Sequence, residues 1–139
     1  MLTVPLVPTA DPGYSETCPC EAKSAARARS LVRAALRTWK LEQLIDDGTL
    51  IVSELVGNSV RHSNCRLVHV SVSLTGPGRV RLSVSDTSTT VPVKQEAGED
   101  DTTGRGLQLV DALAHQWGTD LRRGKKIVWA DLVAGGEPA

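Results

Sequence analysis

A stripe of three polar side chains inside an apolar segment constrains this chain more than any other feature of its sequence. Glu54, Asn58 and His62 follow one another at intervals of four residues, so on a helix they fall within an arc of about 80°. The neighbouring positions, which would face a core, are apolar or small: Val52, Leu55, Val56 and Ser59. A carboxylate and a carboxamide beside buried surface are costly unless a polar group meets them. The stripe therefore predicts a helix that meets a polar ligand, and a metal-bound phosphate would suit it.

Length and charge narrow the class of protein. A chain of 139 residues is expected to form one domain that buries a core without disulfides or structural metals. Sixteen basic and sixteen acidic residues cancel, so no overall charge favours nucleic acid or an anionic membrane. Three tryptophans and one tyrosine are few for a protein that stacks on single-stranded bases. No apolar run is long enough to span a membrane and no signal peptide is visible, so we expect a cytoplasmic protein.

The cysteines give little sign of a metal site or of crosslinking. Cys18, Cys20 and Cys65 are odd in number. The Cys18-Pro19-Cys20 segment has neither the two-residue gap nor the downstream ligand pair of a zinc site. We expect reduced thiols at Cys18 and Cys20, and an ordinary small residue at Cys65.

Two helices are predicted in the first half of the chain. Residues 1–20 are rich in proline and are expected to form a flexible segment or an edge strand. Residues 21–40 have an amphipathic helical pattern whose polar side is basic, with Lys23, Arg27, Arg29, Arg33 and Arg37. This basic side is either a solvated surface or a contact for an acidic protein partner. A second helix is expected from Asp46-Asp47 to about Ser63, and it carries the polar stripe.

The second half favours a sheet. Residues 68–74 and 80–85 alternate apolar and polar residues around a Gly/Pro turn, which predicts a hairpin. Asp86 has the parity of the apolar positions and should face the helices. Residues 87–105 form a long polar segment, expected to be a mobile lid. A helix over 106–114 and strands over 118–121 and 126–133 are expected to follow.

Together these elements predict one α+β domain, a two-layer sandwich with helices on one face of a mixed, mostly antiparallel sheet. The domain is expected over residues 21–133, followed by a tail over 134–139.

Three motifs resemble one family. Residues 54–62, Glu-Leu-Val-Gly-Asn-Ser-Val-Arg-His, resemble the N box of the GHKL, or Bergerat, histidine-kinase-type ATP-binding fold. Asp86 stands where the first glycine box begins, and Thr103-Gly104-Arg105-Gly106-Leu107 resembles the second. Within this fold the chain is similar to small bacterial anti-sigma factor/serine kinase proteins of the actinomycete type. Residues 109–113 and 128–130 also look like that group.

The resemblance implies a set of roles. Asn58 would coordinate Mg²⁺ that bridges the nucleotide phosphates, and Glu54 would act as general base toward a serine hydroxyl or a water. Asp86 would accept a hydrogen bond from the adenine amino group. The segment Gly104, Arg105, Gly106 and Leu107 would contact the phosphates at a helix N-terminus. His62 either contacts phosphate or only caps and packs, and Arg61 has the same two readings.

Two departures from the family pattern leave the function open. Ser88 and Thr90 replace the two glycines that follow the aspartate, and Ile127 stands where the family often has threonine. The first hypothesis is an ATP-dependent serine/threonine protein kinase that controls transcription through an anti-anti-sigma-like partner. The second is a catalytically degenerate module that sequesters a sigma factor or similar regulator. In either case Arg29, Arg33 and Arg37 are a candidate docking surface, and a homodimer is an open alternative.

Overall fold

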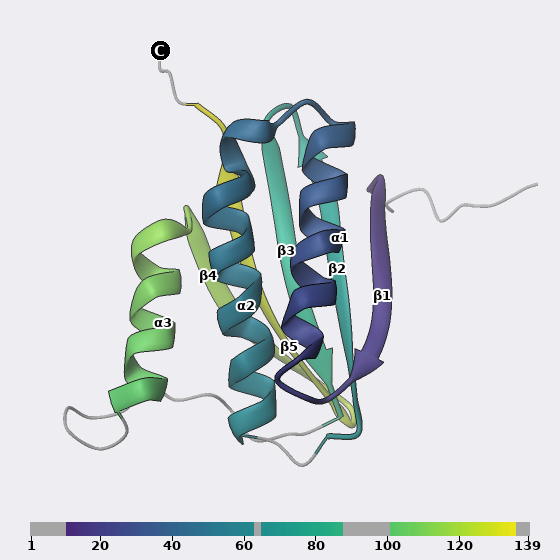
Figure 1. The fold of residues 1–139 in the computed structure, drawn as a ribbon, viewed down its shortest axis with the longest axis vertical. Coiled ribbons are helices and arrows are strands. Elements are labelled where there is room, and N and C mark those ends of the chain that lie inside the picture. The colour runs from purple at the N-terminus through teal and green to yellow at the C-terminus, as the bar shows by residue number, and fades with distance from the viewer. Residues whose placement is uncertain (1–10, 63–64, 88–100, 136–139) are drawn as a thin grey trace, which may run out of the picture.

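The chain folds into two layers, with helices on one face of a single sheet (Figure 1). The structure, a computed structural model, describes residues 11–62, 65–87 and 101–135, excluding the side chains of 101–106. Its elements are β1 (Gly13–Pro19), α1 (Ser24–Thr38), the 3₁₀ turn η1 (Glu42–Leu44), α2 (Ile45–His62), β2 (Leu67–Gly76), β3 (Arg79–Asp86), α3 (Asp101–Leu113), β4 (Gln116–Arg122) and β5 (Lys125–Val133). The strand order is β1-β2-β3-β5-β4. The predicted α+β sandwich is confirmed, and the four pairings between these strands are all antiparallel.

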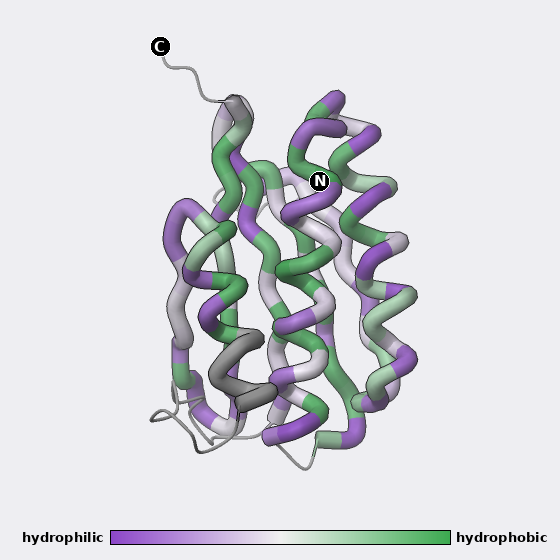
Figure 2. Tube along the Cα trace, turned by 60° about the vertical axis from the view of Figure 1, so that its left-hand side comes forward, coloured by the Kyte–Doolittle hydropathy of each residue, from purple (hydrophilic) through white to green (hydrophobic). Residues whose placement is uncertain are grey.

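Helices α1 and α2 form because their apolar residues recur at helical spacing and can be buried together. In α1 the buried residues include Ala28, Val32, Ala35 and Leu36. In α2 they include Ile51, Val52, Leu55 and Val56. Figure 2 shows apolar and polar residues alternating along the helical coils. Acidic residues in the first turn of α2 and basic residues in its last turn also match the charges of the helix ends.

The sheet forms from two hairpins and one added edge strand. β2 and β3 bury alternate residues against the helices, as the sequence predicts: Val68, Val70, Val72, Val80, Leu82 and Val84. Gly78 and Gly124 occupy the two hairpin turns with φ of 66° and 67°, a backbone conformation that glycine adopts without strain. The described part of the N-terminal segment adds β1 at the edge, beside β2.

Cys20 and Cys65 form a disulfide with a Cα–Cα distance of 5.8 Å. The predictions of a reduced Cys20 and of an unremarkable Cys65 were therefore wrong. The cause is the pairing of β1 with β2, which brings the residues after Pro19 beside those before Leu67. The N–H of Cys20 donates to the carbonyl of Arg66 at 2.8 Å. Cys18 is a free, buried thiol.

Some boundaries differ from the predictions. α3 begins at Asp101, five residues before the expected start, and β4 begins at Gln116 instead of Gly118. The predicted lid over 87–105 has residues 88–100, including Ser88 and Thr90, outside the described part of the chain. Among the described helices, none is long and apolar enough to cross a membrane.

Candidate functional site

The ends of three elements that carry predicted site residues lie together at one end of the molecule. The C-terminal end of α2, the C-terminal end of β3 and the N-terminal end of α3 all lie at the bottom of the view in Figure 1. α2 packs against β3, β5 and α3, so it is the central helix of this end. The fold therefore places the polar stripe of α2 and Asp86 in the same region, as the sequence predicts.

Asn58 faces inward from α2 and is only 2% exposed. Neither its Oδ1 nor its Nδ2 has a hydrogen-bond partner within the described residues. A buried amide without partners costs about 1–3 kcal/mol, so natural proteins keep one only for a reason. An amide oxygen is a suitable ligand for Mg²⁺ that also binds substrate phosphates. The unsatisfied Asn58 side chain therefore fits the metal and nucleotide that the resemblance implies.

Glu54 lies one turn before Asn58 and is partly open to solvent. Its Oε1 is 3.9 Å from Nη2 of Arg61, and both side chains are about one-third exposed. Gly57 leaves room for this arrangement, because a Cβ there would be 3.1 Å from Nη1 of Arg61. A carboxylate that is accessible and is positioned by a guanidinium can take a proton from a hydroxyl that reaches this surface.

His62 is the last residue of α2 and is half-buried. This position agrees with either reading of His62, contact with phosphate or capping and packing. Arg61, by contrast, has a defined role in the structure as the ionic partner of Glu54.

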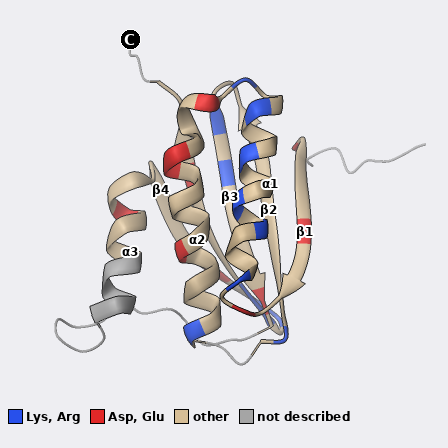
Figure 3. Ribbon diagram, viewed as in Figure 1, with Lys and Arg blue, Asp and Glu red and all other residues tan. Residues whose placement is uncertain are grey.

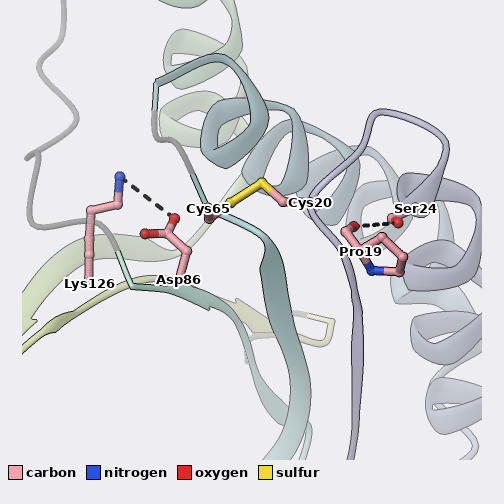
Figure 4. The surroundings of a disulfide bond; sticks show 6 residues. All are labelled: Pro19, Cys20, Ser24, Cys65, Asp86 and Lys126. Atoms are coloured by element: carbon pink, nitrogen blue, oxygen red, sulfur yellow. Dashed lines mark hydrogen bonds and ion pairs between the residues drawn. A yellow bond between two sulfur atoms is a disulfide. The ribbon is translucent and has the colours of Figure 1, made fainter.

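Asp86 is the last residue of β3 and is almost fully buried, as its parity predicts. Its Oδ2 lies 3.8 Å from Nζ of Lys126, and both side chains are completely buried. Figure 4 shows the two side chains pointing toward each other from neighbouring strands. They are direct partners in the antiparallel register of β3 and β5. Sequence reasoning missed Lys126, although its alternation with Val128, Ala130 and Leu132 was a visible signal.

Ile127 and Asp86 lie on opposite faces of the sheet. Lys126 and Val128 are buried against the helices, so Ile127 between them points to the opposite face of the sheet, where it is half-buried. The residue that shares a face with Asp86 is Lys126. Ile127 therefore does not share the surface that carries Asp86, so its side chain does not lie beside the adenine contact that the resemblance implies for Asp86.

The segment from Gly104 to Leu107 lies in the first two turns of α3. The side chain of Leu107 is buried. The first four N–H groups of a helix have no intrahelical acceptor, and with α3 starting at Asp101 this set ends at Gly104. Phosphate contacts from Gly104, Arg105 and Gly106 stay predictions.

The chain thus has an antiparallel sheet with helices on one face and a buried asparagine and aspartate at one end, and a family model identifies its class. The model of the family described as "Histidine kinase-like ATPase domain" matches residues 18–131, and the chain belongs to this family. No curated protein matches the chain.

The chain is similar to several solved structures. The RsbU and RsbW domains of Rv1364c from Mycobacterium tuberculosis match with a TM-score of 0.63 and 22% identity, over 88% of this chain and 32% of that one. The histidine kinase domain of the Erythrobacter litoralis EL346 blue-light activated histidine kinase matches with a TM-score of 0.47 and 18% identity. The match covers 83% of this chain and 61% of that one. The histidine kinase AdeS of Acinetobacter baumannii matches with a TM-score of 0.49 and 12% identity, over 88% of this chain and 68% of that one. The chain thus spans about one-third of the solved mycobacterial chain.

Proposed function

We propose that this chain binds Mg²⁺-ATP and transfers the γ-phosphoryl group to a serine or threonine hydroxyl of a protein partner, as an anti-sigma factor kinase does. The observation that carries the proposal is the buried Asn58 amide without a hydrogen-bond partner in the described structure, one helical turn from the accessible carboxylate of Glu54. Membership of the histidine kinase-like ATPase family supports nucleotide binding.

Each residue has a distinct task in this proposal. Oδ1 of Asn58 would hold Mg²⁺, which supplies positive charge next to the phosphates. Glu54 would take the proton of the acceptor hydroxyl as its oxygen bonds to the γ-phosphorus and ADP leaves. Asp86 would accept a hydrogen bond from the adenine amino group. Gly104, Arg105, Gly106 and Leu107, with His62, would contact the phosphates.

The partner is proposed to be a sigma factor or an anti-anti-sigma-like antagonist with an acidic surface, met in the cytoplasm. Lys and Arg residues recur along α1 (Figure 3). Two of them already have intramolecular partners: Arg27 pairs with Glu16, and Arg29 donates to Oγ of Ser53 at 3.0 Å. Of the predicted docking residues, Arg33 and Arg37 are thus better placed than Arg29 to meet another protein. A homodimer as the functional unit is an open alternative within the same proposal.

Titration calorimetry with Mg²⁺-ATP tests the nucleotide-binding part. We expect saturable binding that EDTA weakens and that Asn58→Ala weakens at least tenfold, because that substitution removes the proposed metal ligand. Glu54→Gln should bind Mg²⁺-ATP normally but lose any ATP hydrolysis in which water takes the place of the acceptor hydroxyl, measured as release of phosphate. Glu42→Gln, an exposed substitution in η1 outside the site, serves as the matched control. Absence of saturable binding at millimolar nucleotide would overturn the proposal.

A second candidate function is a degenerate module that binds its regulator without using ATP. The complete burial of the Asp86–Lys126 ion pair favours this second function, because an adenine that binds Asp86 must compete with the contact that Asp86 already makes to Lys126. This function predicts partner binding that is indifferent to ATP and to the Asn58→Ala substitution.

A further inference from the structure

We infer that Lys126 is a base-recognition residue of the nucleotide site, whose ammonium donates a hydrogen bond to N1 of adenine beside the carboxylate of Asp86. The inference rests on the proposed binding of ATP, and it assigns to this chain's own lysine a part of base recognition that the sequence comparison sought at Ile127.

The position of Lys126 is fixed by the sheet. It lies directly opposite Asp86 in the register of β5 against β3, and alternation along β5 turns its side chain toward the helix layer. On its other side β5 forms a hairpin with β4, in which Arg122 pairs with Lys125, the residue just before Lys126. The position of Lys126 along β5 is therefore well defined. Lys126 therefore shares one surface of the sheet with the residue proposed to hold the adenine amino group.

The ammonium of Lys126 is not satisfied by the described protein. The side chain is completely buried, and Nζ has no hydrogen-bond acceptor within the described residues. Its ionic contact with Asp86 spans 3.8 Å, which is longer than a hydrogen bond. An ammonium has three donors and no acceptor, and leaving a buried charge without hydrogen bonds is expensive. Lys126 thus presents unused donors next to a carboxylate.

A carboxylate beside an ammonium is complementary to a ring edge that carries a donor next to an acceptor. Adenine has such an edge, because its N6 amino group donates and the adjacent N1 accepts. With N6 on Asp86, N1 is the acceptor that we assign to Lys126, the register partner of Asp86 on the neighbouring strand β5. Seating the base there would give the ammonium a charge-assisted hydrogen bond, which is stronger than a bond between neutral groups.

The experiment compares ATP with 1-deaza-ATP, in which N1 is replaced by C–H, by titration calorimetry in the presence of Mg²⁺. We expect the wild-type chain to bind 1-deaza-ATP about 10- to 100-fold more weakly than ATP, as for loss of a hydrogen bond to a charged group. Lys126→Met removes the charge and keeps an unbranched side chain that is one atom shorter. This substitution should weaken ATP binding by a similar factor, and the variant should bind ATP and 1-deaza-ATP with equal affinity.

A second variant guards against misfolding, because Lys126→Met leaves Asp86 buried without its counterion. The double substitution Asp86→Asn with Lys126→Met removes both charges together, and it too should bind ATP and 1-deaza-ATP equally. Lys125→Met is the matched control, since Lys125 is exposed on the same strand, and it should keep the wild-type preference for ATP.

The outcomes separate this inference from the proposed function. If wild-type chain binds both nucleotides equally well, ATP binding stands and the role of Lys126 falls. Tighter ATP binding by Lys126→Met would also overturn it, since the lysine would then be competing with the base for Asp86. If neither nucleotide binds the wild-type chain, the proposed function fails and the inference fails with it.

Discussion

Asn58 combines burial with a lack of hydrogen bonds from the described residues, so its amide weakens the fold that holds it. Leucine has a similar size and no polar atoms to desolvate. We expect Asn58→Leu to stabilise the nucleotide-free chain, by up to about 1–3 kcal/mol, while Mg²⁺-ATP binding is lost. Thermal unfolding measured with and without Mg²⁺-ATP checks both effects. A variant that is less stable and still gains stability from Mg²⁺-ATP would contradict the assignment of Asn58 as a ligand-holding residue.

Two glycines of α2 should respond in opposite directions to the same substitution. A Cβ at Gly57 would meet only the flexible end of Arg61, at 3.1 Å, whereas one at Gly48 would meet Val32 and Leu36 in the core, at 3.1 and 3.3 Å. Alanine favours a helix over glycine by about 1 kcal/mol, and overpacking a core costs about 1–3 kcal/mol. We expect Gly57→Ala to stabilise the chain and Gly48→Ala to destabilise it in urea unfolding. Equal effects of the two substitutions would show that these contacts do not decide stability.

At the scale of elements, the outer face of the sheet is joined by a polar cluster across β3, β4 and β5. Arg81 donates to both carboxylate oxygens of Asp131 at 2.6 and 2.9 Å, and Gln116 donates to one of them at 3.1 Å. The Arg81 guanidinium also lies 4.0 Å above the ring of Trp129. Burial alone would raise the pKa of Asp131, but the hydrogen bonds from Arg81 and Gln116 outweigh burial and lower this pKa.

The lowered pKa of Asp131 gives stability a definite pH dependence. A carboxyl whose pKa is lower in the folded chain stabilises it fully above the unfolded pKa of about 3.9. That contribution is lost as the pH falls through the folded pKa. We expect Asp131→Asn to lower stability at pH 7 and to flatten the loss of stability below pH 4, measured by denaturant unfolding across pH. Parallel pH profiles for the two chains would argue against this contribution.

The elements were predictable from local patterns, and the site only in part. Alternation over residues 68–74 and 80–85 predicts β2, β3 and the inward position of Asp86, because a strand's period of two fixes its faces. Lys126 was missed because the partner of Asp86 is set by the register between β3 and β5, which no local pattern contains. The start of α3 also differed, since propensity alone seldom fixes the first turn of a helix.

At the scale of the whole molecule, the Cys20–Cys65 bond closes a loop that contains both α1 and α2. A crosslink over such a separation stabilises a protein mainly by restricting the unfolded chain, by roughly 2–4 kcal/mol. We expect dithiothreitol to lower the stability of the wild-type chain by this amount. The control is Cys20→Ser with Cys65→Ser, which should have the stability of the reduced wild type and no response to dithiothreitol.

The Cys20–Cys65 disulfide also bears on the proposal that the chain acts in the cytoplasm. The cytosol keeps most thiols reduced, so a cytoplasmic chain must fold without the crosslink. Among the described residues, 21 buried apolar side chains form one core, with members from α1, α2, α3 and every strand except β4, and this core supports folding without the crosslink. A reduced chain that is unfolded at 37 °C would argue against a cytoplasmic role.

The position of β5 sets an order of events during synthesis. β5 lies between β3 and β4, although β4 precedes it along the chain, and within the described sheet β4 pairs only with β5. While a ribosome makes this chain, the edge of β3 stays open and β4 has no place to dock until Val133 has been added. At about 5–20 residues per second this exposure lasts for seconds. An unpaired edge is a template for association with other chains, so slow translation of the last hairpin should favour aggregation over folding.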